Sequence, residues 1–116
     1  MNWYIAKIVF RIVTESNANT NQFDEHLRLI SASSKEEAVL KARVLGLNEE
    51  DYFLNDNLQP IKWEFVNVLD LQPLTEVRDG IELYSHIHED ERGEEYIRYV
   101  HLRAAALQAE NMLAEV

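Results

Sequence analysis

The fold is decided by an alternating stretch near the start of the chain, residues 3–13, which reads WYIAKIVFRIV. From Tyr4 to Ile12 every second side chain is apolar, whereas Lys7 and Arg11 interrupt the other side of the stretch. A period of two is typical of a β-strand with one buried face. A second stretch of this kind, IKWEFVNVLDL, occupies residues 61–71. The two Trp-containing strands therefore form the framework of the fold that the sequence predicts.

Two further alternating stretches predict strands that pair with these two. Residues 23–32 alternate apolar and polar side chains, and a polar, Asn-rich segment at residues 14–22 connects them to the first strand. Residues 81–88 alternate in the same way after the turn signal Asp79-Gly80. We therefore expect a hairpin in each half of the chain.

A helical pattern follows each expected hairpin. Ser34 and Glu37 form a capping box, in which each side chain satisfies a backbone N–H group at the start of a helix. Gly46 suits the left-handed position just past the end of that helix, and residues 47–59 are expected to be irregular. A longer helix is expected over about residues 93–115.

The predicted order of elements is therefore β-β-α-β-β-α. The simplest architecture with this order is an α+β fold, in which four strands form one antiparallel sheet with two helices. A chain of 116 residues fits a single domain, so we expect one domain over residues 1–116, with the C-terminal helix as an oligomerisation element.

The composition excludes several classes of function. Eleven Lys and Arg residues against twenty-one Asp and Glu give a formal charge of −10, which repels nucleic acid and anionic membranes and favours solubility or a basic protein partner. The absence of cysteine removes disulfides, thiolate metal sites and a Cys nucleophile. Since we find no secretion signal and no apolar run of about 20 residues, we expect a cytoplasmic protein with no membrane partner.

Motifs for common enzyme chemistry are missing. The three glycines are explained by the structure around them, so no phosphate-binding or dinucleotide loop is expected, and no serine lies in a Gly-x-Ser-x-Gly elbow. Trp3 and Trp63 are expected to build the core, and an exposed Trp would indicate an interface. The sequence therefore predicts no catalytic residue and no cofactor.

Three histidines are the best candidates for a metal site. His86 and His88 lie two residues apart on the expected strand at residues 81–88, so their rings would face the same side, and His101 follows on the last helix. The alternative is that these histidines are solvated polar residues at a sheet edge.

The last helix carries two apolar strips on different sides. One strip makes a narrow seam, and the other consists of Tyr96, Val100, Ala104 and Leu107. Either the helix is wedged between the sheet and the first helix, or one strip packs against a second copy of the chain. The second alternative predicts a homodimer whose interface is the seam, formed by Tyr99, Leu102, Ala106, Ala109 and Leu113.

Four motifs together resemble a known bacterial family. They are Trp3-Tyr4-x-Ala6-Lys7, Ser34-Lys35-Glu36-Glu37-Ala38, Lys62-Trp63-x-Phe65-Val66-x-Val68-Leu69-Asp70 and Asp79-Gly80-x-Glu82-x-Tyr84-Ser85. In order and spacing these motifs resemble the family called domain of unknown function 4288, over roughly residues 2–87. The resemblance implies a small α+β domain and supplies no activity and no site residue. The helix from Glu94 onward departs from the family pattern.

The function that the sequence favours is a non-enzymatic cytoplasmic interaction module that forms a homodimer and engages a basic protein. The missing motifs, the formal charge of −10 and the two-sided helix support this hypothesis. The alternative is a metal-dependent or small-molecule-binding enzyme with a site near His86 and His88.

Overall fold

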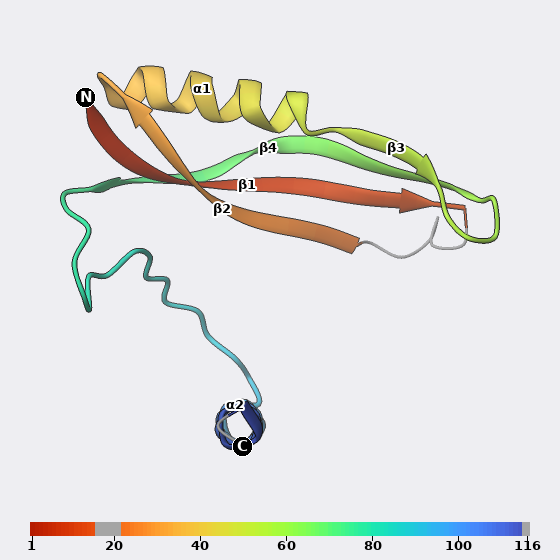
Figure 1. Ribbon diagram of the computed structural model, residues 1–116, viewed down its shortest axis with the longest axis vertical. Helices are drawn as coiled ribbons and strands as arrows, with labels where there is room; N and C mark the ends of the chain where they lie inside the picture. Colours follow the sequence, from red (N-terminus) through yellow and green to blue (C-terminus); the bar gives the residue numbers. More distant parts are fainter. Residues whose placement is uncertain (16–21, 115–116) are drawn as a thin grey trace. The chain divides into compact units, whose positions relative to one another are not determined.

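The computed structural model in Figure 1 describes residues 1–15 and 22–114, and the side chains of residues 111–114 are outside that description. The chain divides into two units, Met1–Ser85 and His86–Val116. That residues 1–116 form one domain stays a prediction.

The first unit is built on one antiparallel sheet of four strands. Its spatial order is β2-β1-β4-β3, and the elements follow the chain in the order β-β-α-β-β-α that the sequence predicts. The α+β fold is therefore confirmed. The strands are β1 (Asn2–Thr14), β2 (Gln22–Ala32), β3 (Asp51–Leu54) and β4 (Pro60–Leu74).

The fourth strand is not the segment that the sequence predicted. Residues 81–88 contain no strand, whereas β3 lies inside the segment expected to be irregular and pairs antiparallel with β4. The side chain of Asn55 closes the turn between them, because its Oδ1 accepts hydrogen bonds at 2.9 Å from the backbone N–H groups of Asn57 and Gln59. β3 pairs only with residues 60–63 of β4, so among the described residues no strand lies on that side of residues 64–74, and residues 81–88 do not pair there either.

One face of the sheet is covered by α1 (Lys35–Asn48) (Figure 1). Ser34 caps this helix as predicted, since its hydroxyl accepts a hydrogen bond from the backbone N–H of Glu37 at 3.2 Å. Ala38 and Ala42 are fully buried, which allows α1 to lie close to the strands. The core between helix and sheet includes Tyr4, Ala6, Ile8, Phe10, Ile30, Ala32 and Leu71.

Gly46 lies inside α1 and not beyond its end, so the predicted helix boundary was wrong. The residue is buried, and a Cβ atom placed there would come within 2.4 Å of the ring of Phe65 and 3.2 Å of Ile8. Glycine is therefore required by the close approach of the helix to β4, and not by a left-handed backbone. The helix continues two residues further, to Asn48.

The second unit contains α2 (Gly93–Ala114), which confirms the predicted C-terminal helix. Residues 86–90 before it have no regular secondary structure. None of the helices in the part of the chain that the structure describes is long and apolar enough to span a membrane.

Candidate functional site

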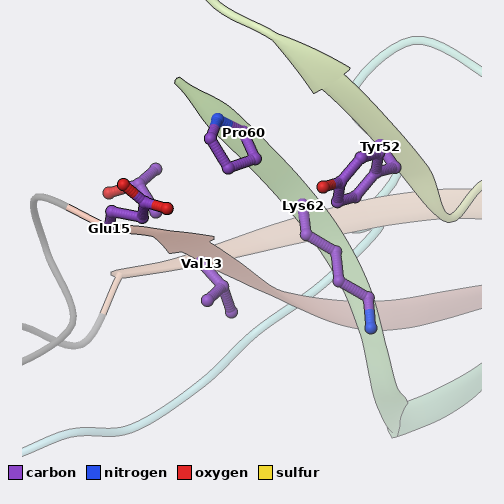
Figure 2. A pocket seen from close by; sticks show the side chains of 6 residues that line it. Val13, Glu15, Tyr52, Pro60 and Lys62 are labelled. Carbon is purple, nitrogen blue, oxygen red and sulfur yellow. The ribbon is translucent and has the colours of Figure 1, made fainter. Parts of the chain in front are cut away.

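A surface hollow of about 370 Å³ lies where β1 ends beside β4 and β3. Figure 2 shows its side chains, with Tyr52 and Pro60 on neighbouring strands and Glu15 well apart from the amino group of Lys62. The register pairs Val13 with Lys62 and Lys62 with Tyr52, so these three side chains share one face of the sheet. The charged groups do not converge, and convergent polar groups are what a catalytic pocket needs.

A polar cluster on the opposite, α1-bearing face has more defined geometry. The Oδ2 atom of Asp24 accepts hydrogen bonds from His26 Nε2 at 2.8 Å and from Trp63 Nε1 at 3.1 Å. The hydrogen bond from His26, followed by that from Trp63, lowers the pKa of Asp24 below its ordinary value. The ring of His26 also packs against Phe10, with 5.0 Å between ring centroids.

The second nitrogen of His26 is engaged as well. Its Nδ1 atom lies 3.5 Å from a guanidinium nitrogen of Arg28, and Arg28 forms an ion pair with Glu49 just past the end of α1. This network is satisfied by a neutral ring in which Nε2–H donates to Asp24 and Nδ1 faces the Arg28 donor. A general base needs a nitrogen that is open to substrate. The cluster therefore connects β2, β4 and the residue that follows α1, with both ring nitrogens of His26 facing protein partners.

From the sequence alone, no role was predicted for this cluster. Asp24, His26 and Arg28 alternate along β2, and residues two apart on a strand point to the same face. This alternation in the sequence indicates a row of polar side chains on one face of β2. Their partners, Trp63 and Glu49, are distant in sequence, so only the fold brings them together.

The two tryptophans have different environments. Trp63 packs against the core and stacks on Phe53, with ring centroids 5.7 Å apart. Trp3 remains 47 % exposed, so its prediction as a core residue was wrong. An exposed Trp is the feature that the sequence analysis linked to an interface.

The three candidate metal-binding histidines lie in the second unit. The rings of His86 and His88 are nearly parallel, with centroids 6.2 Å apart, and His88 packs edge-to-face on Tyr96 at 5.2 Å. His101 lies on α2. Over residues 1–15 and 22–114, no group of three or more His, Asp or Glu side chains is arranged to hold a metal ion. The strand that was expected to align the first two histidines is absent, and the metal site stays a prediction.

The predicted interface residues lie along α2. Tyr99 and Leu102 are 59 % and 65 % exposed, and Ala106 and Ala109 are also exposed. The side chain of Leu113 lies outside the described residues. The second strip also leaves large apolar side chains at the surface, namely Tyr96, Val100 and Leu107.

The residues that match a known protein family coincide with the first unit. The model of the family described as domain of unknown function (DUF4288) matches residues 3–85. The chain belongs to the DUF4288 family. No curated protein and no solved structure is significantly similar to it.

The matched part of this DUF4288 protein ends at the last residue of the first unit, Ser85. The polar cluster around Asp24 and the hollow beside Tyr52 therefore lie within the family domain. His86, His88, His101 and the seam of α2 lie outside the match.

Proposed function

We propose that this DUF4288 protein is a non-enzymatic interaction module that forms a homodimer through α2. The observation that carries the proposal is the exposure of large apolar side chains along a helix of 22 residues. Most of the stability of a protein helix comes from packing of its apolar face, and α2 is the only regular element in the described part of its unit.

The seam of α2 suits a two-fold contact between helices. Tyr99, Leu102 and Ala106 recur at intervals of three and four residues, which places them on one side of the helix. Ala106 and Ala109 would let a second helix approach closely, while Tyr99 and Leu102 supply the apolar area. The commonest oligomers of soluble proteins are two-fold dimers, in which the same surface of each copy meets its equivalent.

Two further observations support a binding role. The polar cluster around Asp24 has both nitrogens of its histidine engaged, and the charged groups of the hollow beside Tyr52 do not converge. The formal charge of −10 would steer a basic protein toward the dimer. We therefore propose a basic protein as the partner, and the cytoplasm as the compartment in which they meet.

The substitution Leu102→Glu tests the α2 interface. Burial of one leucine contributes about 1.5–3 kcal/mol, and a two-fold interface loses this contribution from both copies. We expect the dissociation constant of the dimer to rise about 100-fold or more, measured by sedimentation equilibrium. The full-length chain is used throughout.

The matched control is Gln108→Glu, which adds the same charge to α2 between its two apolar strips. This variant is expected to leave the dissociation constant within a few-fold of the unmodified chain. A monomeric unmodified chain, or equal effects of the two substitutions, would contradict the proposed α2 dimer.

A further inference from the structure

The edge strand β2 is a second surface that is open to pairing. Figure 1 shows β2 along one margin of the sheet, and β1 is its only neighbouring strand among residues 1–15 and 22–114. The outer side of an edge strand presents a row of backbone N–H and C=O groups that can pair with another strand. In β2 this row runs along 11 residues.

Two features that commonly protect an edge strand, proline and a bulge, are absent from β2, although the strand carries charged side chains at Asp24, Glu25 and Arg28. The strand contains no proline and no lysine, and its register with β1 runs without a bulge from Gln22 to Ala32. The irregularities in register occur instead between β1 and β4. Three large apolar side chains on the face away from α1 are about half exposed, namely Phe23, Leu27 and Leu29.

A contact near the end of β2 limits the length that can pair. The amino group of Lys41 on α1 donates a hydrogen bond to the backbone carbonyl of Ser31. This contact occupies an acceptor at the Ala32 end of the strand. The part that remains for pairing runs from Phe23 to about Leu29, and its midpoint is His26.

We propose that β2 pairs antiparallel with β2 of a second copy of this chain, about a two-fold axis at His26. In this register Phe23 lies opposite Leu29 of the second copy, and Asp24 lies opposite Arg28 of the second copy. Each contact occurs twice. The pairing joins two four-stranded sheets into one continuous sheet and covers the backbone groups of both edges.

Charge and size complementarity favour this register over its neighbours. In any alternative register, side chains of the same sheet face must lie opposite each other. The two-fold axis can therefore pass only through a residue of β2, and not between two residues. A centre at Glu25 places two like carboxylates opposite each other, and a centre at Arg28 does the same with two guanidinium groups. A centre at Leu27 sets Asp24 against Ile30 of the second copy. Opposite charges across strands stabilise a pair and like charges destabilise it.

The β2 contact is independent of the α2 contact, because the two surfaces belong to different units. Its test therefore uses full-length chains that all carry Leu102→Glu, so that the α2 seam does not contribute. Leu27 lies opposite Glu25 of the second copy in the proposed register. Two substitutions at this exposed position, Leu27→Lys and Leu27→Glu, then have opposite electrostatic effects.

Sedimentation equilibrium measures the dissociation constants of the two variants. We expect Leu27→Lys to dimerise at least about tenfold more tightly than Leu27→Glu, because only the new lysine is opposite a carboxylate. A centre at Leu27 would place each substituted side chain opposite its own copy and would weaken both variants equally. Equal dissociation constants, or a Leu102→Glu chain that stays monomeric at every concentration, overturn the proposal.

Disulfide trapping gives a second measurement, since the chain has no cysteine of its own. Phe23→Cys and Leu29→Cys are made in separate chains, and both positions are exposed enough to leave the fold unchanged, as circular dichroism would verify. An oxidised mixture of the two is expected to give a cross-linked dimer, whereas each variant alone gives little. A mixture that cross-links no better than the single variants overturns the register.

Discussion

At the scale of single residues, Gly46 shows how closely α1 approaches the sheet. A methyl group at this position would come within 2.4 Å of the Phe65 ring. In an open helix the substitution Gly→Ala gains about 1 kcal/mol, but overpacking a core costs about 1–3 kcal/mol. We therefore expect Gly46→Ala to lower the free energy of unfolding by about 1 kcal/mol, measured by urea denaturation.

The control for this substitution is Gly93→Ala, because nothing lies within 4 Å of a Cβ atom at Gly93. This variant should leave unfolding of the first unit unchanged and favour the start of α2. Stabilisation of the first unit by Gly46→Ala would show that the Phe65 ring moves aside easily.

Asp24 makes the stability of the fold depend on pH in the acid range. Its pKa is lowered by the hydrogen bonds from His26 and Trp63, so the folded state holds the charged carboxylate more strongly than the unfolded state does. This stabilisation of the folded state is fully present when the pH is above the ordinary pKa of an aspartate. It is lost as the pH falls through the lower pKa of the folded state, below about pH 4.

We expect Asp24→Asn to lower the free energy of unfolding at pH 7 by about 1 kcal/mol, since the hydrogen bonds to a charged acceptor are weakened. The difference from the unmodified chain should shrink as the pH is lowered through 4 to 2. Urea denaturation at a series of pH values measures both free energies. A difference that is constant over this range would contradict a role for the charged form of Asp24.

At the scale of elements, the two hairpins differ in how much the sequence indicates. The hairpin of β1 and β2 was predicted because each strand is long and alternates clearly. The strand β3 has only four residues, all exposed, and its position depends on pairing with β4 and on the Asn55 turn. A strand this short carries too little periodicity to be recognised from sequence.

The segment at residues 81–88 shows the opposite error, in which alternation suggested a strand that does not form. Tyr84 instead contacts β1, where its hydroxyl accepts a hydrogen bond from Lys7 Nζ at 3.3 Å and its ring lies 4.8 Å from the same atom. The contact with Tyr84, followed by that with Glu25, raises the pKa of Lys7 above its ordinary value. The segment therefore contacts β1 through the side chain of Tyr84 and forms no strand of the sheet.

At the scale of the whole molecule, the first unit has a core of its own. The buried apolar residues of the described chain lie between Tyr4 and Leu74, and the family match ends at Ser85. We expect a chain that ends at Ser85 to unfold cooperatively, with a thermal midpoint within a few degrees of that of the full chain. Differential scanning calorimetry of the two chains measures both midpoints.

The chain that ends at Ser85 also distinguishes the proposed α2 contact from the proposed β2 contact, because it lacks α2 and keeps β2. Loss of α2 should raise the dissociation constant of the dimer as Leu102→Glu does, while association through β2 should persist. A truncated chain that is unfolded at 25 °C would show that the core of the first unit is insufficient without residues 86–116.

Local patterns in the sequence are sufficient to predict the framework of this protein. Alternation predicted β1, β2 and β4, the capping box at Ser34 predicted the start of α1, and helical spacing predicted α2, because each of these signals is local. The predicted order of elements also used a strand at residues 81–88 that does not form, and the order matches the structure because β3 supplies the fourth strand. Local signals also identified the seam of α2 and the three histidines, whose roles stay predictions.

The long-range contacts between these elements could not be predicted from local patterns and are seen in the folded chain. It brought Trp63 and His26 to one carboxylate of Asp24, placed Phe65 against Gly46, and put β3 at the edge of the sheet. It also left Trp3 exposed and β2 as a long free edge. The periodicity of residues 3–13 specifies that one face is buried, but whether the other face and the edge are covered depends on segments distant in sequence.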